Sequence, residues 1–159
     1  MKIRTGIGFD VHQLAGNEKL ILGGIEIPHN KGCVAHSDGD VLIHAICDAL
    51  LGALGLGDIG AHFPDTDMRY KDIASTRLLA EVNKLITGKG FSICNIDSVI
   101  CLQQPKLREY ISSIQSSIAG VLEIDPGDVS VKATTTEKLG YVGREEGIAA
   151  HAVVLLLKK

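Results

Sequence analysis

The hydrophobic and polar positions of the chain predict four main strands. Apolar residues recur at every second position, which is the period of a strand, in segments 3–12, 91–102, 129–133 and 148–157. Two further apolar triplets flank Gly23-Gly24, a two-residue turn signal, and predict a small β-hairpin.

The first predicted strand distributes its side chains over two faces. Ile7, Phe9 and Val11 share one face, because side chains alternate along a strand. Asp10 and His12 lie on the opposite face, two residues apart, so they project together. This is the arrangement that a metal chelate requires.

Three segments have the periodicity of helices. Segment 41–51 is apolar on nearly all sides, which predicts a well-buried helix. Segments 71–86 and 105–122 are apolar on one face only, and Pro105 suits the first turn of the latter. Residues 55–67 are rich in turn formers and lack periodicity, which predicts a loop.

Strands and helices mixed in this order predict an α+β fold, a mixed α/β sandwich. We expect residues 1–159 to form a single compact domain. Its mixed sheet would have mostly four strands, with helices covering one face and the small β-hairpin beside it.

Composition excludes several classes of partner. Aromatic residues make up 4% of the chain, Trp is absent, the net charge is −3 and Lys and Arg are dispersed, so neither nucleic acid nor an anionic membrane is an expected partner. An anionic substrate would therefore need local neutralisation. The four cysteines form no C-x-x-C pair, which favours free thiols in a reducing cytosol. Without a signal peptide pattern or a spanning segment, the expected location is cytoplasmic.

Asp10, His12 and His44 are the first candidate site. Three N/O ligands with an open fourth position are typical of catalytic zinc. Asp40 and Asp48, one turn either side of His44 on the predicted helix, are candidates to orient its second ring nitrogen. The alternative is that the aspartate caps a turn and the histidines are structural.

His36-Ser37 directly precedes the predicted buried helix. Free N–H groups and the helix dipole favour an anion at such a position. Plain N-capping by Ser37 or Asp38 explains the same residues without a ligand.

The segment after the third predicted strand is a further candidate. Thr134 and Glu137 have the spacing of a capping box. Alternatively, hydroxyl and backbone N–H groups there hold phosphate while Glu137 binds a harder cation such as Mg²⁺.

Other polar residues have two interpretations each. Loop carboxylates can be turn formers or can bind sugar hydroxyls; these are Asp58, Asp65 and Asp67. Cationic contacts are available from Lys106, Arg108, Lys132, Lys138 and Arg144, although each is more often a solvated charge. The remaining histidines, His29, His62 and His151, have no evident partner and are interpreted as structural.

With these residues assembled, the chain resembles the 2-C-methyl-D-erythritol 2,4-cyclodiphosphate synthase family of the non-mevalonate isoprenoid pathway. Five motifs occur in the family's order: Gly8-Phe9-Asp10-Val11-His12, Ala35-His36-Ser37-Asp38-Gly39-Asp40, Gly57-Asp58-Ile59-Gly60, Phe63-Pro64-Asp65-Thr66-Asp67 and Lys132-Ala133-Thr134-Thr135-Thr136-Glu137-Lys138-Leu139-Gly140. The resemblance covers nearly the whole chain.

The resemblance implies a reaction and an assembly. The 2-phosphate of 4-diphosphocytidyl-2-C-methyl-D-erythritol 2-phosphate attacks the β-phosphate, closes a cyclic diphosphate and expels CMP. The protein would be a homotrimer with active sites between neighbouring subunits. One Zn²⁺ per site would be accompanied by Mg²⁺ or Mn²⁺ on the substrate diphosphate, and an isoprenoid diphosphate can occupy a cavity on the trimer axis.

The resemblance also assigns roles to residues. Zn²⁺ would be bound by Asp10, His12 and His44, and Mg²⁺ or Mn²⁺ by Glu137. His36 and Thr135 would stabilise the transition state. The methylerythritol and ribose would be held by Asp58, Ile59, Gly60, Phe63, Pro64, Asp65, Thr66 and Asp67. The cytidine-diphosphate pocket would be lined by Leu102, Gln103, Gln104, Pro105, Lys106, Leu107, Arg108, Thr134, Thr135, Thr136 and Glu137. Further substrate contacts are expected from Asp10, Val11, His12, His36, Ser37, Tyr141 and Arg144.

Two segments depart from the family pattern. Residues 102–108 read Leu-Gln-Gln-Pro-Lys-Leu-Arg where the family often has small residues. The resemblance therefore does not fix the details of the cytosine pocket. Tyr141 stands where the family commonly has Phe, near Arg144, which is a candidate contact for an isoprenoid diphosphate.

Two other functions compete with the cyclase. A zinc-dependent phosphohydrolase would use metal-bound water. A non-catalytic isoprenoid-diphosphate-binding module would carry a structural metal, but a structural site is closed by four protein ligands and only three can be named. That count favours catalysis.

Overall fold

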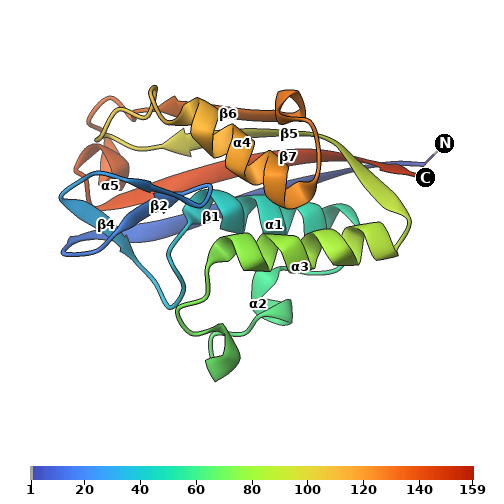
Figure 1. The fold of residues 1–159 in the computed structure, drawn as a ribbon. Coiled ribbons are helices and arrows are strands. Elements are labelled where there is room, and N and C mark those ends of the chain that lie inside the picture. Colours follow the sequence, from blue (N-terminus) through green and yellow to red (C-terminus); the bar gives the residue numbers. More distant parts are fainter. Residues whose placement is uncertain (1) are drawn as a thin grey trace.

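A five-stranded mixed sheet and three long helices form the two layers of the fold (Figure 1). The structure is a computed structural model that describes residues 2–159. The sheet has the order β4-β1-β7-β5-β6, in which only β5 and β6 are parallel. Its strands are β1 (Ile3–Gly16), β4 (Lys31–Val34), β5 (Phe91–Cys101), β6 (Val129–Thr134) and β7 (Gly147–Lys158). The separate hairpin consists of β2 (Leu20–Leu22) and β3 (Ile25–Ile27).

The helices cover one face of this sheet. The helix α1 (Val41–Ala53) packs on β1 and β7, while α4 (Ile111–Leu122) packs on β6 and α3 (Ser75–Gly88) packs on both helices (Figure 1). Shorter helices are α2 (Ile59–His62) and α5 (Gly140–Gly143), with 3₁₀ turns at Met68–Tyr70 and Pro126–Asp128. The hydrophobic core lies between the sheet and the three long helices.

The prediction of a buried helix over 41–51 is confirmed. Every residue of α1 is buried except Asp48 and Gly52. The helix approaches β1 so closely because Gly8 has no side chain. A Cβ atom at Gly8 would lie 1.8 Å from the carbonyl oxygen of Ala45. This backbone-to-backbone contact fixes α1, and therefore His44, above the strand that carries Asp10.

Asp40 is a structural residue that joins α1 to the β2–β3 hairpin. Its carboxylate accepts hydrogen bonds from the backbone N–H groups of Ile43 (3.0 Å), Gly23 (3.0 Å) and Gly24 (2.7 Å). It is fully buried, and burial raises the pKa of Asp40 to about 6, although the three donors act in the opposite direction. The two glycines have φ of +60° and +79°, which confirms the predicted hairpin turn.

The prediction of four strands in the sheet is wrong, because the structure has a fifth at the edge. β4 has four residues and pairs with Gln13–Gly16, an extension of β1 beyond the predicted end at residue 12. A segment this short carries no measurable alternation. It becomes a strand because the extension of β1 offers free backbone groups for pairing.

Two predicted helix starts are also wrong. Residues 71–74 precede α3 as a turn in which Asp72 has a φ of +56°. Residues 105–110 precede α4, and Pro105 is not in its first turn. In that segment Leu107 is buried by a turn rather than by a helix, since the N–H of Tyr110 bonds to the carbonyl of Leu107.

The sheet face opposite the helices is open and apolar along β1 and β7. Exposed fractions are 73% for Ile7, 49% for Phe9, 44% for Val11 and 49% for Val153. Phe9 also packs against His151, with 4.8 Å between ring centroids. Such a row of bulky apolar side chains is typical of a surface that another protein covers.

The cysteines and the helices give two further findings. All four cysteines are free, as predicted. Within residues 2–159, no helix is both long enough and apolar enough to cross a membrane.

Candidate metal and phosphate site

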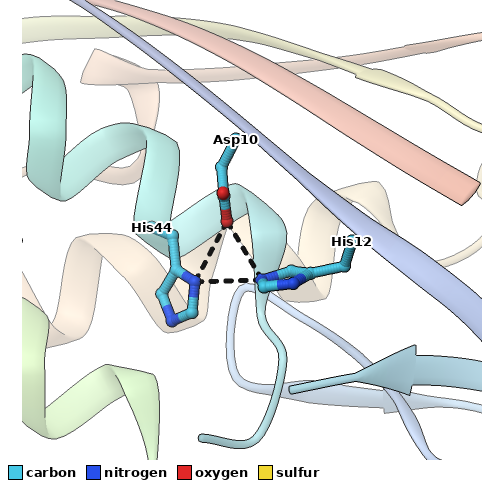
Figure 2. Close-up of side chains that lie close together, drawn as sticks. All are labelled: Asp10, His12 and His44. Carbon is cyan, nitrogen blue, oxygen red and sulfur yellow. Dashed lines mark hydrogen bonds and ion pairs between the residues drawn. The ribbon is translucent and has the colours of Figure 1, made fainter. Parts of the chain in front are cut away.

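Asp10, His12 and His44 point toward one another at the contact between β1 and α1 (Figure 2). Oδ2 of Asp10 lies 3.0 Å from Nε2 of His12 and 3.0 Å from Nδ1 of His44. The two ring nitrogens are 3.2 Å apart. Strand alternation along β1 places Asp10 and His12 side by side, and the close packing of α1 on β1 brings His44 to them.

The electrostatics of this triad suit a cation. Burial alone would raise the pKa of Asp10, but hydrogen bonds from His12 and His44 hold it well below its usual range. Burial opposes a charge on His44, yet Asp10 raises the pKa of its imidazole. An ionised carboxylate and two imidazoles around one point form a donor set typical of catalytic zinc. The ligand atoms all lie within 4.8 Å of one another, so one ion fits the group.

The second ring nitrogen of His44 contacts hydroxyl groups. Nε2 lies 2.9 Å from Oγ of Ser75 and 3.3 Å from Oγ of Ser37. The prediction that Asp40 and Asp48 orient this nitrogen is wrong. Asp40 binds the hairpin, and Asp48 accepts a hydrogen bond from the N–H of Ile59 (2.8 Å).

A cavity of about 580 Å³ opens beside the triad. Ten of its lining residues come from or border the predicted motifs: Asp10, His12, Ala35, His36, Ser37, His44, Ile59, Gly60, Phe63 and Asp65. The others were not predicted as site residues: Val34, Met68, Tyr70, Lys71, Ile73 and Leu78. The sequence assigns Lys71, Ile73 and Leu78 to a predicted amphipathic helix, and Val34, Met68 and Tyr70 lie outside every motif.

The start of α1 is not capped by Ser37 or Asp38. Asp40 is the N-cap, and the hydroxyl of Ser37 accepts from the N–H of Gly39 at 3.2 Å, faces His44 and lines the cavity. His36 lines the same cavity. The anion-site interpretation of His36 and Ser37 therefore stays open, whereas the capping alternative is wrong.

The loop carboxylates have different positions. Asp65 lines the cavity. Asp58 caps α2 through the N–H of Ala61 (2.9 Å), and Asp67 pairs with Arg69 at 2.6 Å. The other predicted contacts in this region that do not line the cavity are Val11, Pro64 and Thr66.

A second cavity of about 450 Å³ lies at the ends of β5 and β6. Seven of its lining residues were predicted for the cytidine-diphosphate pocket: Leu102, Pro105, Lys106, Leu107, Arg108, Thr134 and Thr135. The predicted contacts outside its lining are Gln103, Gln104, Thr136, Glu137, Tyr141 and Arg144. No residue lines both cavities within the described part of the chain.

Glu137 does not belong to a capping box. β6 ends at Thr134, and the next helix, α5, begins only at Gly140. Glu137 and Lys138 have φ of +53° and +64°, and the N–H of Glu137 faces Oγ1 of Thr135 at 3.3 Å. The segment is thus a tight turn with exposed hydroxyl and carboxylate groups beside the second cavity, which agrees with the phosphate alternative.

The remaining candidates are structural or exposed. Nε2 of His62 lies 2.8 Å from the carbonyl oxygen of Leu56, and Lys132 pairs with Asp97 at 2.5 Å. Arg144 on the surface pairs with Glu146 at 3.0 Å.

Comparison with known proteins identifies close relatives. A family model described as the YgbB family matches residues 3–157. The chain is 60% identical over 154 residues to 2-C-methyl-D-erythritol 2,4-cyclodiphosphate synthase of Chlorobium phaeobacteroides (strain BS1), covering 97% of each chain. It is 59% identical over 157 residues to the enzyme of that name from Prosthecochloris aestuarii (strain DSM 271 / SK 413), covering 99% of this chain and 100% of the relative.

Solved structures have the same fold. The bifunctional IspDF of Campylobacter jejuni superposes with a TM-score of 0.96 and 47% identity over 99% of this chain, which spans 43% of that longer protein. IspF of Plasmodium falciparum in complex with CDP superposes with a TM-score of 0.87 and 38% identity, covering 99% of this chain and 97% of that one. The family match over nearly the whole length, the relatives and the mixed α+β fold agree: this chain belongs to the YgbB family.

Proposed function

We propose that the chain converts 4-diphosphocytidyl-2-C-methyl-D-erythritol 2-phosphate into 2-C-methyl-D-erythritol 2,4-cyclodiphosphate and CMP, in the non-mevalonate isoprenoid pathway. The observation that carries the proposal is the triad of Asp10, His12 and His44 in the wall of the larger cavity. The names of the relatives support the substrate class.

The reaction needs positioning more than covalent chemistry. An oxygen of the 2-phosphate forms a bond to the β-phosphorus, the bond from that phosphorus to the bridging oxygen breaks, and CMP leaves with the electron pair. Phosphoryl transfer of this kind asks the protein to align the reacting groups and to neutralise charge. His36 and Ser37 line the cavity beside the triad and would contact the transferred phosphate.

Divalent cations complete the proposed site. Asp10, His12 and His44 would hold Zn²⁺, and Glu137 would hold Mg²⁺ or Mn²⁺ together with the substrate diphosphate. Bound cations supply neutralisation of the phosphates and stabilisation of developing charge. Thr135, half-buried beside Glu137 and lining the smaller cavity, would donate a hydrogen bond from its hydroxyl to the diphosphate.

The two cavities each supply one part of the proposed site. The smaller cavity would take the cytidine diphosphate, a role supported by the binding of CDP to Plasmodium falciparum IspF. Because the cavities share no lining residue, we propose a homotrimer in which the larger cavity of one subunit meets the smaller cavity of its neighbour. The open apolar face of β1 and β7 would be buried between the subunits. An isoprenoid diphosphate on the trimer axis, near Arg144, stays part of this proposal.

Two competing functions fit less well. Among the described residues, the metal-ligand group has three members and opens onto a cavity, whereas a structural zinc site is closed by four. A phosphohydrolase remains the nearer competitor, and its products differ from those of the cyclase.

Removal of the metal is expected to stop the reaction. Protein dialysed against a strong chelator should release no CMP from the substrate, because the phosphate charges stay unneutralised. Release should return when Zn²⁺ and Mg²⁺ are added together, measured by chromatography of CMP. CMP release that survives in protein shown by elemental analysis to be free of metal would contradict the proposed mechanism.

Ile7→Glu is expected to break the trimer. The side chain is 73% exposed in the single chain, and the proposed interface would bury a charge at each copy, at about 3–5 kcal/mol for an unpaired charge. Sedimentation velocity should show trimers for the parent protein and monomers for the variant. Leu85→Glu on α3, where the side chain is 37% exposed, is the matched control and should stay trimeric. A parent protein that sediments as a monomer, or a trimeric Ile7→Glu, would refute the proposed interface.

A further inference from the structure

We infer that Ser75 and Asp38 are positioning residues that hold the His44 ring in the orientation needed for the metal. The inference rests on the proposed metal site at Asp10, His12 and His44. It concerns the side of His44 that faces away from that site, where the second ring nitrogen lies (Figure 2).

A hydrogen-bond relay through His44, Ser75 and Asp38 begins at this nitrogen. Nε2 of His44 lies 2.9 Å from Oγ of Ser75, which in turn donates a short hydrogen bond to Oδ1 of Asp38. The other carboxylate oxygen of Asp38 accepts from the backbone N–H of Ser75 at 2.9 Å. Oδ1 of Asp38 also accepts from the N–H of Asp40 at 3.2 Å. Asp38 is therefore fixed by three donors from two separate segments.

The chemistry of imidazole fixes the direction in which hydrogen bonds are donated along this relay. A neutral ring that binds a metal through Nδ1 carries its hydrogen on Nε2. That N–H can donate to Oγ of Ser75, whose own hydroxyl hydrogen donates to Asp38. Each donor then has one acceptor, and the relay ends on the carboxylate of Asp38. A metal-bound histidine held by a carboxylate is a recurrent arrangement, and here a serine is interposed.

Burial makes Ser75 the decisive member. Ser75 is fully buried and His44 is 6% exposed, so bulk water cannot replace the lost hydroxyl without entering the core. The hydroxyl of Ser37 is farther from Nε2, at 3.3 Å, and lies on the cavity side. Without Ser75, Nε2 loses the shorter of its two hydroxyl contacts, the one that connects the ring to Asp38 and helps to keep Nδ1 toward Asp10.

Asp38 also has a purely structural role that any test must separate. Its carboxylate binds the first N–H of α3, and its own N–H bonds to the carbonyl of Ile73 (3.3 Å). These contacts dock the start of α3 on the segment before α1. A variant that removes only the serine hydroxyl leaves both contacts in place.

Ser75→Ala is that variant. The expected result is Zn²⁺ affinity about 10–100-fold weaker than in the parent protein, the range seen when the partner of a metal-bound histidine is removed. Affinity is measured by competition of the metal-free protein with a chromophoric chelator for Zn²⁺. Ser98→Ala is the matched control, since Ser98 is also buried and its hydroxyl donates to the carbonyl of Ser130 (2.8 Å), away from the triad. The control should keep the affinity of the parent.

Asp38→Asn tests whether Ser75 and Asp38 act together in the relay. The amide oxygen can still accept from the N–H of Ser75, but the NH₂ group cannot accept from its hydroxyl. The double variant with Ser75→Ala should bind Zn²⁺ no more weakly than the weaker single variant, because residues in one network are not additive. The absorption bands of bound Co²⁺ should shift in both single variants and stay unchanged in Ser98→Ala, which a loss of helix capping alone would not produce.

The outcomes separate the inference from the proposed function. If the parent protein binds Zn²⁺ and Ser75→Ala binds it as tightly as Ser98→Ala, the relay is refuted while the metal site stands. If the losses of Zn²⁺ affinity in the two single variants add up in the double variant, the relay is likewise refuted. A parent protein with no Zn²⁺ affinity would overturn both. If Ser75→Ala fails to fold by circular dichroism, the absorption bands of Co²⁺ bound to Asp38→Asn decide: a shift of the bands supports the relay, and unchanged bands refute it.

Discussion

Replacement of His44 by alanine is expected to abolish tight Zn²⁺ binding and CMP release while the protein stays folded. His44 supplies one of three ligand atoms, and its ring lies 3.0 Å from Asp10 and 3.2 Å from His12. Loss of several kcal/mol of charge stabilisation corresponds to a fall in CMP release of about 10³-fold or more. Isothermal titration with Zn²⁺ and chromatography of CMP measure the two effects.

His29→Ala is the control for this variant. His29 lines neither cavity and is not a member of the triad, so its removal should leave both Zn²⁺ binding and CMP release unchanged. Circular dichroism must show the same helix content in both variants. Parent-level CMP release by a folded His44→Ala would contradict the assignment of the triad to the reaction.

Gly8→Ala is expected to destabilise the protein by about 3 kcal/mol or more, at the upper end of the cost of overpacking a core. The added Cβ would lie 1.8 Å from the carbonyl oxygen of Ala45 and 2.8 Å from the backbone nitrogen of Ala49. Both are backbone atoms of a buried helix, so no side-chain rotation relieves the contact. Urea denaturation measures the change in free energy of unfolding.

Gly16→Ala provides the matched control in the same strand, because a Cβ there meets no atom within 4 Å. Its free energy of unfolding should stay close to that of the parent. Gly8→Ala should also weaken Zn²⁺ binding, since α1 must move away from β1 and carries His44 with it. Equal stability of the two glycine variants would show that the contact between β1 and α1 is looser than the structure has it.

Local patterns predicted the parts of the fold that depend on neighbours in sequence. Strand alternation correctly placed Asp10 and His12 on one face, and the apolar run over 41–51 correctly predicted the buried helix of His44. The hairpin turn followed from Gly23-Gly24. The triad of Asp10, His12 and His44 could be assembled from these pieces because each of the three residues lies inside a strongly periodic element.

The features that escaped prediction depend on distant parts of the chain. β4 pairs with the extension of β1, and the first N–H of α3, that of Ser75, donates to Asp38, which lies 37 residues earlier. Separation along the sequence also prevented the prediction of Ser75 as the hydrogen-bond partner of His44. Spacing along one helix suggested Asp40 and Asp48, but both carboxylates bind backbone N–H groups of other segments.

The substrate contacts were the least predictable part of the site. The motifs correctly marked the neighbourhood of both cavities, yet Met68, Tyr70 and Lys71 line the larger one without any sequence signal. Glu137 and Arg144 lie outside both linings in the single chain. In the proposed homotrimer these residues would act together with a neighbouring subunit, and the pattern of a single chain does not predict such an arrangement.

The most direct test of the proposed function is the identity of the phosphorus products. The protein is incubated with 4-diphosphocytidyl-2-C-methyl-D-erythritol 2-phosphate, Zn²⁺ and Mg²⁺, and the reaction is followed by ³¹P NMR, with His44→Ala as the blank. The account predicts one resonance of CMP and two coupled resonances of a cyclic diphosphate, with no inorganic phosphate. Inorganic phosphate or a linear phosphate product in place of the cyclic one would identify a phosphohydrolase and contradict the account.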